Sequence, residues 1–67
     1  MKLIPGQYYK FPAWNEPFLF LYFAKNSKEK WDIIGVRSTT KGVSRWNTKA
    51  IPNMLLSNKK EFDAKGQ

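Results

Sequence analysis

Residues 18–25 read Phe-Leu-Phe-Leu-Tyr-Phe-Ala-Lys, and seven of these eight side chains are apolar. Bulky residues follow one another without the gaps of an amphipathic helix, and Pro17 and Asn26 bound the run, so it predicts a strand buried on both faces. A membrane-spanning helix needs about 20 apolar residues, so this run is too short to cross a bilayer. We expect the rest of the chain to be organised around covering this strand.

Turn residues divide the neighbouring sequence into further strands. Two prolines exclude regular pairing through the segment that precedes residue 18, and Gly42 is placed to adopt a positive φ in a turn. Ring-rich and β-branched runs between the turns are typical of strands. The predicted strands are 7–11, 18–25, 30–37 and 43–46, and the predicted connections are 12–17, 26–29 and 38–42. The sequence therefore predicts a first strand followed by a three-stranded antiparallel meander.

The C-terminal part admits two structures. Ile51, Leu55 and Phe62 are spaced by four and seven residues, and Pro52 is acceptable in a first helical turn, so we prefer one helix over residues 52–65. The alternative is a turn at 51–53, a final strand at 54–56 and a loose basic tail. In either case we expect residues 64–67 to fray.

The composition is that of one small basic domain covering residues 1–67. The 67 residues include no cysteine, which excludes disulfides and thiolate metal sites, and 16% of them are aromatic, which suits a short chain that must fill a core. Twelve Lys and Arg against five Asp and Glu give a net charge of +7. Such a balance favours polyanionic partners, which are nucleic acid, an acidic protein surface or anionic lipid.

The first six residues, Met-Lys-Leu-Ile-Pro-Gly, contain two adjacent apolar side chains before a turn signal, which are too few for the core of a secretory signal peptide. Together with the lack of cysteine, this predicts a cytoplasmic protein without integral membrane association. We expect the chain to be a complete small gene product that is a monomer or a weak dimer.

Pairing residues 18–25 with 30–37 across a four-residue turn would assign the side chains to two faces. The predicted pairs are Lys25 with Lys30, Phe23 with Asp32, Leu21 with Ile34 and Leu19 with Val36. The face with Leu19, Leu21, Phe23, Ile34 and Val36 is the expected core under the C-terminal segment. The other face carries Phe18, Phe20, Tyr22, Trp31, Ile33 and Arg37, and a five-residue second turn would add Val43 and Arg45 to it. A shift of one residue in either turn reverses these assignments.

The second face combines rings with basic groups, as in a platform where bases stack on rings and Lys or Arg neutralise phosphates. In so short a chain, Phe18, Phe20 and Tyr22 are more often core residues. The expected centre of the binding surface is Trp31, Arg37, Arg45 and Trp46, surrounded by Tyr8, Lys10, Lys30, Lys41 and Lys49. Arg45→Ala is expected to weaken nucleic-acid binding and to flatten its salt slope by about one unit.

A short first strand, a three-stranded meander and a C-terminal helix together resemble the layout of small single-strand-binding and chromatin-type barrels. Residues 50–54, Ala-Ile-Pro-Asn-Met, resemble the turn before the last strand of SH3 domains. The acidic loop and paired tryptophans with which SH3 domains bind proline-rich peptides are missing, so no binding role is carried over. The predicted fold class is mainly β (small α+β), either an SH3-like or OB-like partly open small barrel or a bent antiparallel meander with a short C-terminal helix.

Catalysis is not expected. The five acids, Glu16, Glu29, Asp32, Glu61 and Asp63, lie in a loop, a turn, a strand and the tail, and no pair is placed to act as acid and base. The chain has no histidine, so a serine or tyrosine nucleophile would lack the usual activating base. A glycine-rich phosphate-binding loop is also missing. No cofactor and no metal site are predicted.

These observations predict a non-catalytic protein that binds nucleic acid, either DNA or RNA, through phosphate contacts and ring stacking with low sequence specificity. The alternative is a small protein-interaction module, of a phage or plasmid type, that binds and modulates an acidic host protein surface. The two functions differ in their use of aromatic residues. Stacking requires flat accessible rings, whereas protein docking buries rings as anchors in a pocket.

Overall fold

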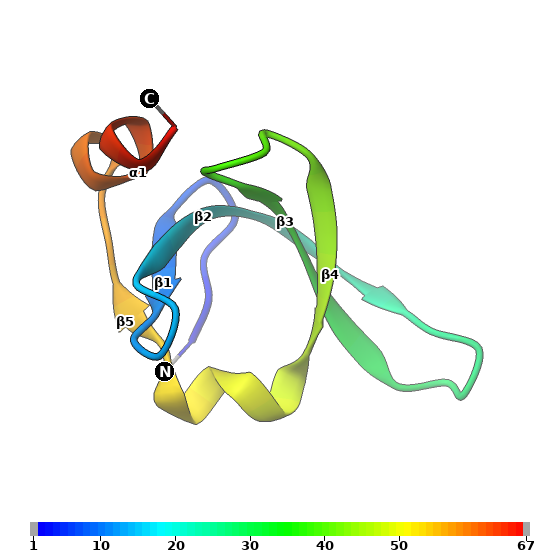
Figure 1. Ribbon diagram of the computed structural model, residues 1–67. Coiled ribbons are helices and arrows are strands. Elements are labelled where there is room, and N and C mark those ends of the chain that lie inside the picture. Colours follow the sequence, from blue (N-terminus) through cyan, green and yellow to red (C-terminus); the bar gives the residue numbers. More distant parts are fainter. Residues whose placement is uncertain (1, 67) are drawn as a thin grey trace.

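A computed structural model describes residues 2–66, and this part of the chain forms a curved five-stranded sheet with one short helix (Figure 1). The elements are β1 (Tyr8–Phe11), β2 (Glu16–Lys25), β3 (Trp31–Arg37), β4 (Val43–Asn47), the 3-10 turn η1 (Thr48–Asn53), β5 (Leu55–Leu56) and α1 (Lys59–Lys65). All neighbouring strands are antiparallel, in the order β4-β3-β2-β1-β5. Within the described residues β4 and β5 remain edges, so the sheet is not closed into a barrel. The predicted mainly β class with a C-terminal helix is confirmed.

The preferred single helix over residues 52–65 is wrong, and the alternative of a turn and a final strand is closer to the structure. Pro52 lies inside η1, and β5 adds to the sheet beside β1. The helix begins only at Lys59, where the side chain of Asn58 accepts a hydrogen bond from the Glu61 N–H at 2.8 Å. Of the tail that we expected to fray, residues 64 and 65 close α1, and residue 67 lies outside the described residues.

The β2–β3 hairpin departs from the predicted register at its tip. Lys25 pairs with Trp31 rather than with Lys30, so the connection is one residue longer than expected. Leu21 is an extra residue in β2, and this bulge restores the predicted pairing of Leu19 with Val36. The second turn is also longer, because Val43 pairs with Val36. Val43 and Arg45 therefore lie on the face of Ile34 and Val36, opposite to the one predicted.

The core lies on the face that we expected to bind a partner. Phe18, Phe20 and Ile33 are at most 1% exposed, and they form the core with Leu3, Tyr9, Phe11 and Met54. We call this side the concave face, because the sheet curls around it and η1 runs along its open end (Figure 1). Tyr22, which we grouped with the buried rings, is instead exposed on the convex face. Phe18, Phe20, Ile33 and Arg37 share one face as predicted, but that face, rather than the opposite one, holds the main core. On the face that we expected to be the core under the C-terminal segment, Ile34 is buried at 6% exposure, whereas the bulge moves Phe23 to the other face.

The helix α1 packs on the opposite, convex face. The Phe62 ring is buried, its centroid lies 5.2 Å from that of Tyr8, and the Lys41 Nζ lies 4.2 Å from the ring centroid. Lys41, rather than Gly42, adopts the positive φ of this turn, at 59°. Lys10 donates a hydrogen bond to Glu61 at 2.7 Å and joins the helix to β1. No helix of residues 2–66 has the length and apolar character needed to cross a membrane.

Candidate binding surface

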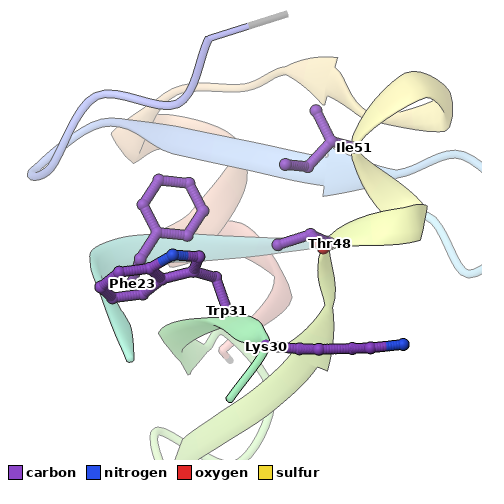
Figure 2. Close-up of a pocket in the computed structure, with 5 residues that line it drawn as sticks. All are labelled: Phe23, Lys30, Trp31, Thr48 and Ile51. Carbon is purple, nitrogen blue, oxygen red and sulfur yellow. The ribbon is translucent and has the colours of Figure 1, made fainter. Parts of the chain in front are cut away.

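An apolar hollow opens between the β2–β3 hairpin and η1 (Figure 2). Its volume is about 610 Å³, and its lining residues are Phe23, Lys30, Trp31, Thr48 and Ile51. Figure 2 shows the two rings on one side and the η1 side chains on the other, while Lys30 extends away from the rings. Phe23 is 38% exposed and Trp31 is 53% exposed, so both rings are accessible from solvent. We call this site the first hollow.

Local backbone features position the two rings of the first hollow. The bulge at Leu21 turns Phe23 onto the concave face, opposite Ile33, where its ring centroid lies 4.9 Å from that of Phe20. Trp31 is the first residue of β3 and extends beyond the end of β4, whose last pair is Asn47 with Asp32. The Phe23 ring is therefore supported by a core residue, whereas Trp31 is paired with Lys25 of β2 and lies beyond the end of β4.

Lys30 is the lysine that lines the first hollow. Lys25 and Lys28 lie in the same hairpin, Lys49 follows Thr48 in η1, and all four lysines are exposed. The Lys25 Nζ also lies 5.3 Å from the centroid of the Trp31 ring. The same hairpin carries the carboxylate of Glu29, whose 3.8 Å contact with Lys25 is solvent-exposed and therefore weak. The hairpin and η1 therefore present four exposed lysines and this one exposed glutamate.

A second hollow, of about 570 Å³, lies on the other side of η1. Its lining residues are Phe11, Pro12, Ala13, Trp14, Trp46, Asn47, Ala50 and Asn53, none of which is charged. Trp14 belongs to the β1–β2 loop and is 63% exposed, and its ring centroid lies 5.0 Å from that of Phe11. The three tryptophans of the chain thus all line one of these two hollows.

The structure brings together some of the residues that we predicted as the centre of the binding surface. Trp31 lines the first hollow and Trp46 the second, and Arg37 lines a narrow cleft next to Trp46. Arg45 lies on the convex face, where its Nε is 3.2 Å from a carboxylate oxygen of Asp32. Arg45 is therefore not part of the surface that the tryptophans form.

Arg37 is engaged in a structural ion pair. Its Nε and one terminal nitrogen donate to the two carboxylate oxygens of Glu16 at 3.1 and 2.9 Å, and the Thr39 hydroxyl donates to the same carboxylate at 2.7 Å. The hydrogen bonds from Arg37 lower the pKa of Glu16, and that carboxylate raises the pKa of Arg37. The pair connects the beginning of β2 to the end of β3, so Arg37 is less available to an external anion.

The residues that we predicted around the centre of the binding surface lie on both faces of the sheet. Lys30 and Lys49 lie at the first hollow. Tyr8, Lys10 and Lys41 lie with α1 on the convex face, where they contact Phe62 or Glu61. The hydrogen bond from Lys10 lowers the pKa of Glu61. These three residues help to hold the helix.

Sequence reasoning missed Phe23 and Trp14. Phe23 was assigned to the core because nothing local marks the bulge at Leu21. The sequence does indicate that Trp14 is exposed. Its large ring lies between two closely spaced prolines, which is typical of a loop, and complete burial is rare in loops. The exposed rings of the surface thus come from a loop and from a hairpin end rather than from the middle of the sheet.

The fold and these two hollows define a small, mainly antiparallel-sheet protein with aromatic concavities and exposed lysines in the β2–β3 hairpin and η1. No model of a known protein family, no curated protein and no solved structure matches the chain. In the part of the chain that the structure describes, no group of three or more acidic, histidine or cysteine side chains could hold a metal ion.

Proposed function

We propose that this protein is a non-catalytic nucleic-acid-binding protein that takes up single strands at the first hollow. The observation that supports this function is the pair of exposed rings, Phe23 and Trp31, with Lys30 in the lining of the hollow and the Lys25 Nζ 5.3 Å from the Trp31 ring centroid. Each base that stacks on an aromatic side chain contributes about 1–3 kcal/mol, and lysines that neutralise phosphates add a salt-dependent term. Ring faces accept every base, so the expected sequence specificity is low.

The shape of the first hollow favours single strands over a duplex. The exposed rings between the hairpin and η1 can be reached by an unstacked base, whereas the bases of a duplex are stacked on one another and present only their edges. Single-stranded DNA and RNA both offer such bases. The proposal includes a cytoplasmic location, which is supported by the lack of cysteine in the sequence.

A protein-interaction module is the second candidate, and the β5 edge favours it. Leu55 and Leu56 are 49% and 65% exposed on a strand that pairs on one side with β1. An extended segment of another protein could add to such an edge. In this role the rings of the first hollow would enclose an apolar anchor instead of a base.

The test is fluorescence anisotropy with labelled oligothymidylate, oligouridylate and duplex DNA at low and moderate salt. Trp31→Ala should weaken binding of the single strands by roughly 5- to 150-fold, since one stacked base is lost, and Trp31→Phe should retain much of the affinity. Tyr22→Ala removes a similarly exposed ring from the convex face of the neighbouring strand and is the matched control. Circular dichroism establishes that each variant is folded.

Two results would contradict the proposal. If the wild-type protein binds none of the three nucleic acids at low salt, the nucleic-acid function is wrong, and the protein-interaction role becomes the leading candidate. If Tyr22→Ala weakens binding as much as Trp31→Ala, binding does not depend on the rings of the first hollow.

A further inference from the structure

We infer that the second hollow is a second stacking subsite for the same strand, so that one polynucleotide crosses η1 with a base held on either side. This inference rests on the proposed function and extends it. The ligand is then a single-stranded oligonucleotide of several nucleotides rather than a mononucleotide. Its strand runs across η1, and one of its bases stacks on Trp14.

The geometry of η1 separates the two hollows. A 3-10 turn has three residues per turn, so side chains three positions apart align in rows. Thr48 and Ile51 line the first hollow, whereas Ala50 and Asn53 line the second. Lys49 and Pro52 make up the remaining row, and both are exposed. Lys49 therefore stands on the ridge between the hollows.

The second hollow has the chemistry of a stacking site. The exposed ring of Trp14 rests on Phe11, and the centroid of Phe11 lies 5.5 Å from that of Trp46, which is itself packed against the core. Such a supported ring loses little side-chain freedom when a base stacks on it. The exposed amide of Asn53 offers a hydrogen-bond donor and an acceptor to a base edge.

Charge near the second hollow does not oppose a polyanion. The carboxylate of Glu16 lines a narrow cleft with Trp14 and Trp46, and the guanidinium of Arg37 neutralises it. None of the ion pairs among the described residues involves Lys49. A phosphate between the two stacked bases would pass over the ridge beside this lysine.

The distance across η1 sets the length of the ligand. An α-helix with its side chains is roughly 10–12 Å across, and a 3-10 turn is tighter. A strand advances about 3.4 Å per nucleotide when it is stacked and more when its bases leave the stack, so at most about three or four nucleotides would link the two hollows. Occupation of both subsites therefore requires an oligonucleotide of several nucleotides, up to about six, in the range that small single-strand binders cover.

The experiment is a length series of labelled oligothymidylates, from two to about twelve nucleotides, with wild type, Trp14→Ala and Trp14→Phe. In the wild type, affinity should increase steeply once the strand is long enough to span η1. Trp14→Ala should remove this step and weaken binding of the longer strands by roughly 5- to 150-fold, and Trp14→Phe should restore most of it. Tyr22→Ala should leave the step unchanged.

A second measurement does not depend on removing Trp14. The double variant Trp31→Phe, Trp46→Phe retains Trp14 as its single tryptophan. Long oligothymidylates should quench the fluorescence of Trp14, whereas dinucleotides should not.

The outcomes separate the two proposals. If Trp14→Ala binds every length as the wild type does, or if Trp14 emission is unaffected by a bound long strand, the second subsite is wrong even though Trp31→Ala still weakens binding. If the wild type binds no length at low salt, the proposed function itself is wrong.

Discussion

Gly35 determines how closely the rings of the concave face approach one another. It pairs with Phe20, and a Cβ at this position would lie 2.8 Å from the carbonyl oxygen of Leu19, 2.8 Å from Phe18 Cδ2 and 3.1 Å from Trp46 Cζ3. The Phe18 and Trp46 ring centroids are 4.6 Å apart. The lack of a side chain at Gly35 thus allows Trp46 to pack against the core and to form the wall of the second hollow.

Gly35→Ala should lower the free energy of unfolding by about 1–3 kcal/mol, because the carbonyl of Leu19 is backbone held in the sheet and cannot move aside. Urea denaturation followed by tryptophan fluorescence measures the change. Gly42→Ala is the matched control, because its Cβ would lie 3.4 Å from the Thr40 hydroxyl oxygen, and it should change stability by no more than about 0.5 kcal/mol. Equal stability of the two variants would contradict this account of the packing.

The Glu16 carboxylate makes stability depend on pH. Hydrogen bonds from Arg37 and then Thr39 lower its pKa in the folded protein, and its side chain is 15% exposed. An unfolded chain has a glutamate pKa of about 4.3, so the stabilisation is complete above that pH and is lost as pH falls through the lower folded pKa.

Glu16→Gln should therefore be less stable than the wild type by about 1 kcal/mol at neutral pH, and the difference should close on acidification. Unfolding curves at a series of pH values measure the gap. Glu29→Gln removes the same charge from a largely exposed side chain and controls for the change in net charge. A gap that stays constant down to low pH would show that the carboxylate of Glu16 is not the titrating group.

At the scale of elements, α1 is held by its contacts with the convex face. A helix of seven residues is too short to be stable alone, and Phe62 is its buried side chain. Phe62→Ala should lower the free energy of unfolding by about 2–4 kcal/mol and reduce the helical signal in circular dichroism. Binding to single strands should not change while the sheet is folded, because both hollows lie on the concave side. Phe62→Leu, which keeps an apolar anchor, should have a smaller effect on both signals.

A reduced affinity in folded Phe62→Ala would contradict this separation of the faces. A helical signal equal to that of the wild type would show that the cap at Asn58 and the Lys10–Glu61 pair hold α1 without Phe62.

For the whole molecule, the distribution of charge matters more than its sum. Arg37, Arg45, Lys10 and Lys59 each have a carboxylate within 3.2 Å, whereas Lys28, Lys30 and Lys49 take part in none of the ion pairs among the described residues. We therefore expect removal of the charge at Lys49, rather than at Arg45, to weaken nucleic-acid binding, because Arg45 lies on the convex face beside Asp32.

If Lys25, Lys28, Lys30 and Lys49 each contact a phosphate, the salt slope for single strands should be about −3, at about −0.7 for each contact. Lys49→Ala should flatten this slope by about 0.7, and Arg45→Ala should change it less. Plots of log affinity against log salt concentration, measured by anisotropy, test both variants. If Arg45→Ala flattens the slope as much as Lys49→Ala, the strand also contacts the convex face.

The sequence alone determined the class of the fold and the four longer strands, whose ends it placed within two residues of those observed. It did so because the signals are local: prolines and turn residues end strands, and β-branched or aromatic runs favour extended backbone. The last strand appeared only in the alternative to the preferred helix, because the spacing of Ile51, Leu55 and Phe62 matches a helical face although these residues belong to three different elements.

Only the tertiary structure decided which side chains point inwards and which rings remain exposed. Side chains alternate between the faces of a sheet, so the longer turns and the bulge at Leu21 move Tyr22, Phe23, Val43 and Arg45 to the faces opposite to those predicted, without leaving a local signal. The deciding factor is packing: Phe18, Phe20 and Trp46 fit together on one side because Gly35 leaves space there. Phe23 and Trp31 consequently extend past the core to the first hollow, and the position of that hollow follows from this packing rather than from any motif in the sequence.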